Sequence, residues 1–94
     1  MLFAPRSILT IKIGIMKKVI YYITKQVDGN EHYKLLKSAS IAKSIALLDL
    51  ERSKRECIND GYHIAPVEGK NNAFLATNEF EKITFEYGEV EITI

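Results

Sequence analysis

Three residues with reactive side chains, Cys57, Asp60 and His63, fall within seven positions of one another. A thiol, a carboxylate and an imidazole are the groups of a nucleophile, an orienting acid and a base. A thiolate nucleophile needs a lowered pKa, which a helix N-terminus or a neighbouring cation provides. Cys57 instead falls near the expected C-terminal end of a helix, where the helix dipole disfavours a thiolate. We therefore interpret Cys57 as a core residue and Asp60-Gly61 as a helix end.

The sequence contains no recognisable metal-binding or phosphate-binding motif. His32, Cys57 and His63 are the ligand-type residues, and they lack the paired spacing of metal sites. The glycines are single and fall at expected turns, so no phosphate-binding loop is predicted. We expect no metal and no cofactor.

Two pairs of carboxylates, Glu79/Glu81 and Glu89/Glu91, are spaced to share one face of a strand. General acid catalysis needs a carboxyl group in an apolar or charge-coupled pocket, which shifts its pKa. Both pairs are expected on a solvated strand face. We therefore predict no catalytic residue and no enzyme.

Length and composition indicate one small folded domain. The chain has 94 residues, 47% of them hydrophobic and 27% charged, and a single cysteine, which excludes an internal disulfide. The apolar runs are far shorter than the roughly 20 residues of a membrane span, and no signal peptide is recognisable. We expect a cytosolic protein without membrane contact.

The N-terminal segment has two interpretations. Leu9, Ile11, Ile13 and Ile15 alternate with small or polar residues, which is typical of a strand. Met16 also resembles a natural start of a small protein. Residues 1–15 are therefore either an extension or an edge strand, and residues 16–94 form the single domain.

The first predicted hairpin follows directly. Residues 17–25 are rich in Val, Ile and Tyr, which favours a strand. Asp28-Gly29 is typical of hairpin turns, because both central positions can need positive φ. Residues 31–37 are the predicted returning strand, after a loop of four or five residues.

A helix is predicted next. Ser38 and Ser40 mark its start, since a serine hydroxyl can accept from the first-turn amides. From Ile41 onward the apolar period changes to 3.6. The expected apolar stripe consists of Ile41, Ile45, Leu47, Leu48, Leu50, Cys57 and Ile58. Gly61 suits the left-handed position after the helix, whose length is about twenty residues, or roughly 30 Å.

The last third of the chain is predicted to contain strands and turns. A short strand, a turn and a second short strand are expected at 62–67, 68–72 and 73–77. Pro66 places the first of these strands at an edge. Apolar residues alternate over 82–87 and again over 90–94, and Gly88 permits a turn between them. We therefore predict a C-terminal hairpin with one apolar and one polar face.

These elements predict an α+β fold in the order β-β-α-β-β-β, with or without an extra N-terminal strand. A mainly antiparallel sheet of four to six strands is expected, with one long amphipathic helix packed on one face. The second sheet face stays open in this prediction. If nothing covers that face, it is free for a partner or for a homodimer.

Nucleic-acid binding is the second functional hypothesis. Tyrosines on a sheet can stack on bases while lysines contact phosphate. The predicted hairpin carries such residues: Lys17, Lys18, Tyr21, Tyr22, Tyr33 and Lys34. A net charge of +1 and the absence of a family motif weaken this hypothesis.

Protein binding is the leading hypothesis. Residues 1–67 carry eleven Lys or Arg and six Asp or Glu, a net of +5, whereas residues 68–94 carry two Lys and six Glu, a net of −4. Either the two halves neutralise each other on neighbouring strands, or Glu86, Glu89 and Glu91 meet a basic partner. The composition is typical of small proteins of AT-rich bacteria or their phages, many of which block a host or defence protein. We therefore expect a binding or regulatory module, such as an inhibitor from a phage or mobile element.

Overall fold

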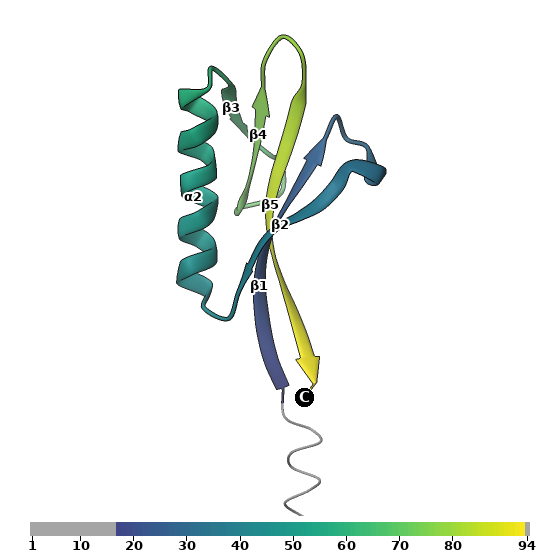
Figure 1. Ribbon diagram of the computed structural model, residues 1–94, viewed down its shortest axis with the longest axis vertical. Helices are drawn as coiled ribbons and strands as arrows, with labels where there is room; N and C mark the ends of the chain where they lie inside the picture. The colour runs from purple at the N-terminus through teal and green to yellow at the C-terminus, as the bar shows by residue number, and fades with distance from the viewer. Residues whose placement is uncertain (1–16, 94) are drawn as a thin grey trace, which may run out of the picture.

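The computed structural model describes residues 17–93, which form a five-stranded antiparallel sheet with one α-helix packed on it (Figure 1). The elements are β1 (Lys17–Val27), the 3₁₀ helix η1 (Glu31–Tyr33), β2 (Lys34–Ser40), α2 (Lys43–Asn59), β3 (His63–Pro66), β4 (Ala73–Thr77) and β5 (Lys82–Thr93). The predicted α+β class and element order are confirmed. The interpretations of residues 1–15 lie outside the described residues.

The sheet has the strand order β2-β1-β5-β4-β3, so the first and last strands of residues 17–93 lie side by side, with β5 at the centre. β1 and β5 pair along their whole length, from Lys17 opposite Thr93 to Val27 opposite Ile83. β2 and β4 pair with only part of that length. The far ends of β1 and β5 therefore extend beyond the sheet as a two-stranded ribbon (Figure 1).

The β1–β2 connection contains the predicted Asp-Gly turn. Asp28 and Gly29 both have positive φ, 53° and 68°. The Asn30 side chain then accepts from the backbone N–H of His32 at 2.9 Å, which stabilises a helical turn. Residues 31–33, predicted as strand, therefore form η1, and β2 begins directly after it.

The predicted helix start at Ser38 and Ser40 is wrong. Both residues belong to β2, and α2 begins at Lys43. The Ser40 hydroxyl does accept a backbone N–H, but it is that of Ala42, which precedes the helix. The Ser38 hydroxyl donates to the carboxylate of Asp49 and so links β2 to α2. The polar signal was real, but it belongs to the turn before the helix.

The helix end is confirmed. Gly61 has a φ of +88°, which favours glycine. The N–H of Tyr62 donates to the carbonyl of Cys57 at 2.9 Å, and that of Gly61 donates to the carbonyl of Ile58 at 3.1 Å. These two bonds define a Schellman motif. α2 has 17 residues, fewer than predicted. No helix among residues 17–93 is long and apolar enough to cross a membrane.

The predicted C-terminal hairpin is wrong, because β5 continues through Gly88 without a turn. Gly88 lies opposite Tyr22, and a Cβ atom added to it would come within 2.5 Å of the Tyr22 ring. A strand glycine often marks such a close approach. The apolar side chains change faces here: Phe85 faces α2, whereas Val90 and Ile92 face the opposite side. Because the apolar residues switch from one face of the strand to the other at Gly88, the sequence pattern there resembles that of a turn.

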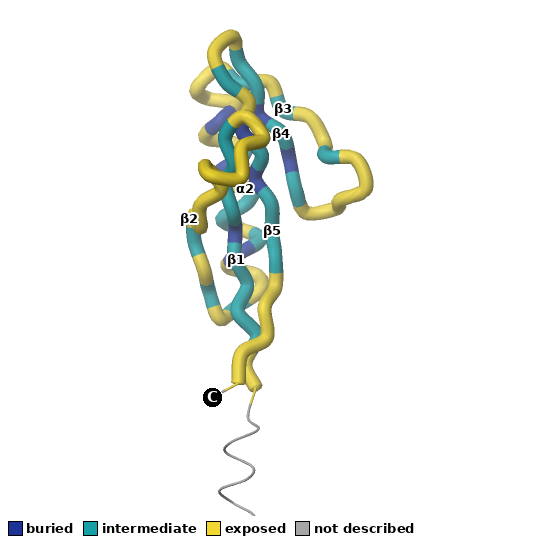
Figure 2. Tube along the Cα trace, turned by 90° about the vertical axis from the view of Figure 1, so that its right-hand side faces the viewer, coloured by how far each residue is buried: buried dark blue, intermediate teal, exposed yellow. Residues whose placement is uncertain are grey.

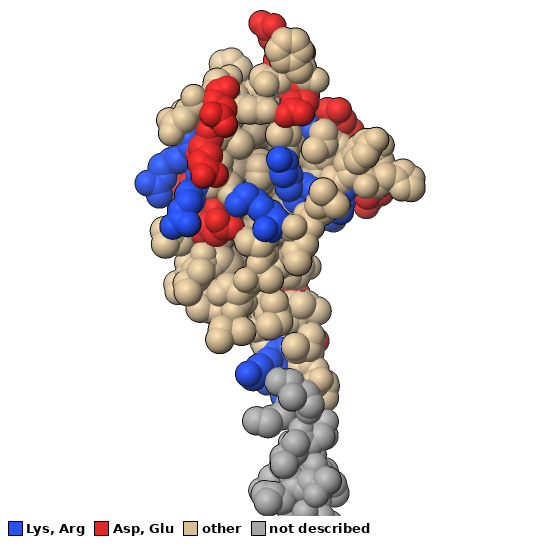
Figure 3. Space-filling view, in the orientation of Figure 1, with Lys and Arg blue, Asp and Glu red and all other residues tan. Residues whose placement is uncertain are grey.

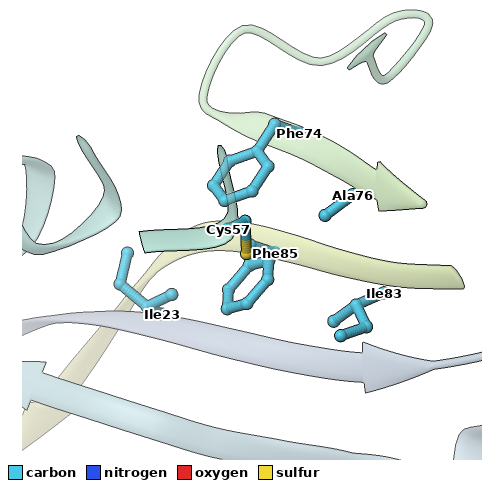
Figure 4. Close-up of a cluster of buried hydrophobic side chains, with 6 residues drawn as sticks. All are labelled: Ile23, Cys57, Phe74, Ala76, Ile83 and Phe85. Atoms are coloured by element: carbon cyan, nitrogen blue, oxygen red, sulfur yellow. The ribbon is translucent and has the colours of Figure 1, made fainter. Parts of the chain in front are cut away.

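The core lies between α2 and the upper part of the sheet (Figures 2 and 4). It consists of Ile23, Cys57, Phe74, Ala76, Ile83 and Phe85. The rings of Phe74 and Phe85 stack at a centroid distance of 4.7 Å. Figure 2 shows that the ends of β1 and β5 are mostly exposed.

The predicted apolar stripe of the helix is confirmed for Cys57, which is in the core, and for Leu50, which packs against it, but it is wrong for most of its other members. α2 buries the small residues Ala46, Ser53 and Cys57 against the sheet. Four members of the stripe, Ile41, Ile45, Leu48 and Ile58, are more than half exposed. Small side chains allow the helix backbone to approach the sheet closely, and the larger residues then lie on the flanks.

The two sheet edges differ. β3 has four residues and, among residues 17–93, pairs only with β4, with Pro66 opposite Phe74. The edge position predicted from Pro66 is confirmed. β2 forms the other edge, has seven residues and contains no proline.

Candidate functional site

The structure does not bring Cys57, Asp60 and His63 together as a reactive group. Cys57 is 8% exposed and belongs to the core (Figure 4). Cys57 and Asp60 line a hollow of about 190 Å³ on the β2 side of the helix. His63 is exposed at the start of β3 and lines a different hollow with Thr77 and Asn78. The imidazole therefore does not face the thiol.

The environment of Cys57 disfavours a thiolate. Burial raises the pKa of the Cys57 thiol above its ordinary value, and Lys25 only partly offsets this rise. Asp60 and Glu56 raise the pKa further. A thiol with a raised pKa stays protonated at neutral pH, so it is a poor nucleophile.

Some of the polar groups that line the hollow beside Cys57 are bonded to other side chains. The Tyr62 hydroxyl donates to the Glu81 carboxylate; this bond, followed by burial, raises the pKa of Tyr62. Lys37 reaches Asp49 at 3.4 Å. Within residues 17–93, no three His, Cys, Asp or Glu side chains are placed to hold a metal ion.

The residues of the predicted nucleic-acid surface lie on both faces of the sheet. Tyr21 and Lys17 are on the α2 side, where the Tyr21 ring stacks on Tyr87 at 6.4 Å. Tyr22 is on the opposite side and its ring lies over Gly88. The two adjacent tyrosines therefore cannot stack bases on one surface.

The other members of this set are also dispersed. Lys18 lies on the two-stranded ribbon, Tyr33 is in η1, and Lys34 begins β2. Lys17 forms an ion pair with Glu91. In the part of the chain that the structure describes, these side chains therefore form no continuous track for a nucleic-acid strand.

The predicted acidic contact residues of β5 each have a lysine partner. The ion pairs are Lys70–Glu86 at 2.6 Å, Lys43–Glu89 at 3.8 Å and Lys17–Glu91 at 3.4 Å. Two of these pairs, Lys43–Glu89 and Lys17–Glu91, join the basic first part of the chain to the acidic last part, whereas Lys70–Glu86 lies within the last part. Of the two, Lys17–Glu91 joins neighbouring strands, which is the arrangement that one interpretation predicted. Exposed pairs of this kind add little stability.

Glu89 has a second contact. It accepts a hydrogen bond from the Tyr87 hydroxyl at 2.7 Å. Burial, followed by this bond, raises the pKa of Tyr87 to about 12. Tyr87 also packs against the core, so its ring contacts core residues while its hydroxyl bonds to the more exposed Glu89.

The most unusual feature is a group of large apolar side chains that the fold leaves outside. We call it the apolar edge surface, and it consists of Leu35, Leu36, Ile41, Ile45 and Leu48. Each of them is between 52% and 75% exposed. All five come from one stretch of chain that includes β2 and the first turns of α2. Leu36 faces away from α2, because it lies opposite Thr24, so the five side chains lie on both faces of this sheet edge and along the helix flank. Exposed apolar side chains gathered at one edge mark interaction sites more often than the rest of a protein surface.

The strand and the helix that carry the apolar edge surface are joined by side-chain contacts. Asp49 contacts Lys37 and Ser38 of β2, and Ile45 and Leu48 lie within one turn before it on the same helix. In Figure 3 the face over the lower part of α2 is mainly uncharged, whereas charged side chains gather over its upper part. This surface therefore combines a sheet edge with an apolar helix flank.

Sequence reasoning assigned the helix residues to the core and did not select the two leucines of β2. One signal was available. Leu35 and Leu36 are adjacent, so in a strand their side chains point to opposite faces, and only one can face the helix. Whether β2 is an edge, however, depends on the pairing of distant strands, which no local pattern reveals.

Comparisons of the chain with protein-family models, with curated proteins and with solved structures found no match. A functional inference therefore rests on the residues of this chain and their geometry.

Proposed function

We propose that this chain is a small protein-binding module that takes up a segment of a partner along β2, over the apolar edge surface. The observation that carries the proposal is the exposure of five large apolar side chains beside an edge strand. Burying such side chains against a partner contributes roughly 25 cal/mol per Å² of apolar area, before the costs of association.

The geometry favours strand addition. An edge strand presents N–H and C=O groups that an extended segment can pair with. Leu35 lies on the α2 side of β2 and Leu36 on the other, because Leu35 is opposite Lys25 and Leu36 opposite Thr24. Alternate side chains of an added strand would therefore pack against Leu35 and the helix flank on one side, and against Leu36 on the other.

The charges around β2 favour a partner that differs from this chain. Lys34 and Lys37 flank the two leucines, and Lys37 is already paired with Asp49, so Lys34 is the main charge offered to a partner strand. Lysines on an edge strand oppose pairing with an identical basic edge. They favour an extended segment that carries acidic residues beside its apolar ones. A homodimer through β2 is therefore the weaker proposal.

Such a module acts by binding a partner segment and blocking its other contacts. A partner segment bound along β2 is excluded from its other contacts, which suits a regulatory or inhibitory role in the cytosol. Nucleic-acid binding has less support, because Tyr21 and Tyr22 face opposite sides and Lys17 pairs with Glu91.

The test is quantitative capture with the tagged full chain from lysate of its own host, with and without nuclease. Wild type is compared with Ile45→Glu and with the matched control Ile58→Glu. Both residues are on α2 and are similarly exposed, 58% and 51%, but only Ile45 belongs to the apolar edge surface. We expect a stoichiometric protein that survives nuclease, is lost with Ile45→Glu and persists with Ile58→Glu.

Two outcomes would overturn the proposal. Capture that disappears with nuclease would move the function to the Tyr/Lys residues, and removal of the charges at Lys17, Lys18 and Lys34 should then abolish it with a steep salt dependence. Equal loss with Ile45→Glu and Ile58→Glu would show that the apolar edge surface has no special role.

A further inference from the structure

Phe80 is the most exposed of the large apolar side chains in the described part of the chain, at 87%. It lies in the turn between β4 and β5, at one end of the molecule (Figure 1). A single exposed apolar residue is ordinary on a protein surface and argues nothing by itself. Two further observations distinguish Phe80, namely the fixed backbone beneath it and the charge around it.

The backbone of the turn is held by side-chain hydrogen bonds. The Asn78 side-chain oxygen accepts from the N–H of Phe80 at 2.8 Å and from that of Glu81 at 2.9 Å. The N–H of Asn78 donates to the carbonyl of Glu81 at 3.1 Å, which closes the turn. The ring therefore projects from an ordered backbone. Binding does not have to order this backbone, so the cost in conformational entropy is reduced.

The base of the turn is fixed as well. The N–H of Lys82 donates to the Asp28 side chain at 3.0 Å, so the turn is joined to the β1–β2 connection. The Tyr62 hydroxyl, from the start of the β3 segment, donates to Glu81. Phe80 is thus displayed on a turn braced from two other parts of the chain.

The surroundings of Phe80 are acidic. Glu79 and Glu81 are its neighbours in sequence, and Glu79 is exposed. Glu81 accepts from Tyr62 and lines a hollow that contains Asp60 and also the lysines Lys25 and Lys37, so Glu79 is the carboxylate that can meet a partner beside the ring. In Figure 3 acidic side chains lie at the upper end of the molecule, beside an uncharged projection. Carboxylates around an aromatic ring oppose contact with nucleic acid or with an anionic membrane.

We infer that Phe80 is an anchor side chain that inserts into an apolar pocket of a protein partner, and that the rim of this pocket carries Lys or Arg. Aromatic residues buried in partner pockets supply much of the energy of many interfaces. Basic groups at the rim would pair with Glu79 and attract the ring by a cation–π contact. The inference rests on the proposed protein-binding function and adds a contact separate from the apolar edge surface.

The first experiment measures affinity for the purified partner identified by capture. Phe80→Ala is expected to weaken binding by about 30-fold or more, the usual effect of removing a hot-spot residue. Phe80→Tyr keeps the ring and is the matched control, with binding expected to stay within about threefold. Glu79→Gln is expected to slow association and to reduce its dependence on salt. Both substituted positions, Glu79 and Phe80, are exposed, so the folded state is retained.

The second experiment locates the contact. The photoreactive residue p-benzoylphenylalanine replaces Phe80 in the full chain, and the cross-linked partner peptides are mapped by mass spectrometry. The same residue at position 58 is the control. We expect position 80 to cross-link to apolar partner residues with Lys or Arg nearby, and position 58 to give no such product.

The outcomes separate this inference from the proposed function. A partner that is lost with Ile45→Glu but binds Phe80→Ala like wild type overturns the Phe80 inference and leaves the proposed function standing. Absence of a cross-link from position 80 to the partner has the same meaning. Recruitment of the chain to uncharged phosphatidylcholine vesicles through Phe80 would also overturn the inference, because Phe80 would then insert into lipid and not into a pocket of a protein.

Discussion

The molecule has two groups of large apolar side chains with opposite fates. The core assembles from positions far apart in sequence, from Ile23 in β1 to Phe85 in β5. The apolar edge surface comes from one continuous stretch that includes β2 and the start of α2. The core is therefore a product of topology, whereas the apolar edge surface is a local property of one segment. Residue type alone does not distinguish them.

This difference implies that stability and binding can be altered separately. Changes in the core should lower the free energy of unfolding and leave partner selection intact. Changes in the apolar edge surface should do the reverse. The following predictions test that separation.

The largest effect on stability is expected for Phe85→Ala. Phe85 is 4% exposed and stacks on Phe74, so its truncation should lower the free energy of unfolding by about 3–5 kcal/mol, measured by urea titration with circular dichroism. The control is the same substitution at Phe80, expected to change stability by about 0.5 kcal/mol or less. Equal losses for the two variants would contradict the assignment of Phe85 to the core.

A smaller effect is expected for Cys57→Ala. The thiol packs in the core, and removing its sulfur should lower the free energy of unfolding by on the order of 1 kcal/mol. Partner capture should be unchanged, because Cys57 is assigned to packing. A variant that folds but loses its function would overturn that assignment.

A pH-dependent effect is expected at Tyr87, where the core meets the solvent. Its pKa is raised to about 12, whereas an unfolded tyrosine titrates near about 10. Between these values the unfolded chain releases the proton and the folded chain keeps it. The contribution of Tyr87 to stability is therefore complete below pH 10 and is lost as the pH rises. Urea midpoints from pH 9 to 11 should fall more steeply for wild type than for Tyr87→Phe, and parallel curves would contradict the raised pKa.

The smallest effect on stability is expected for Ile45→Ser. The side chain is 58% exposed, so the free energy of unfolding should change by about 0.5 kcal/mol or less. The same variant should weaken partner capture. A loss of stability comparable to that of Phe85→Ala would mean that the apolar edge surface belongs to the core after all.

Local signals in the sequence predicted much of the fold. Gly61 marked the helix end because the left-handed conformation there favours glycine. Pro66 marked an edge strand because it cannot donate a backbone hydrogen bond. The Asp-Gly turn after β1 was equally local. Each of these predictions needed only the residue and its immediate neighbours.

Signals that depended on distant pairing were missed. Gly88 was taken for a turn, because its contact with Tyr22 joins positions from opposite ends of the chain. Ile45 and Leu48 were placed in the core, because the helix face that meets the sheet is set by the small residues that fit there. The candidate surface was missed for the same reason, since the edge position of β2 follows from the pairing of β1 with β5.

The contact between Tyr22 and Gly88 also governs alignment of the two longest strands. Successive side chains of a strand point to opposite faces, so sliding β1 past β5 by two positions would preserve which side each residue faces. After such a slide the Tyr22 ring would lie opposite Glu86 or Val90 and would meet a side chain. Gly88 leaves space for the Tyr22 ring in the observed register of β1 and β5. The absence of a side chain at Gly88 therefore helps to select the register in which β1 pairs with β5.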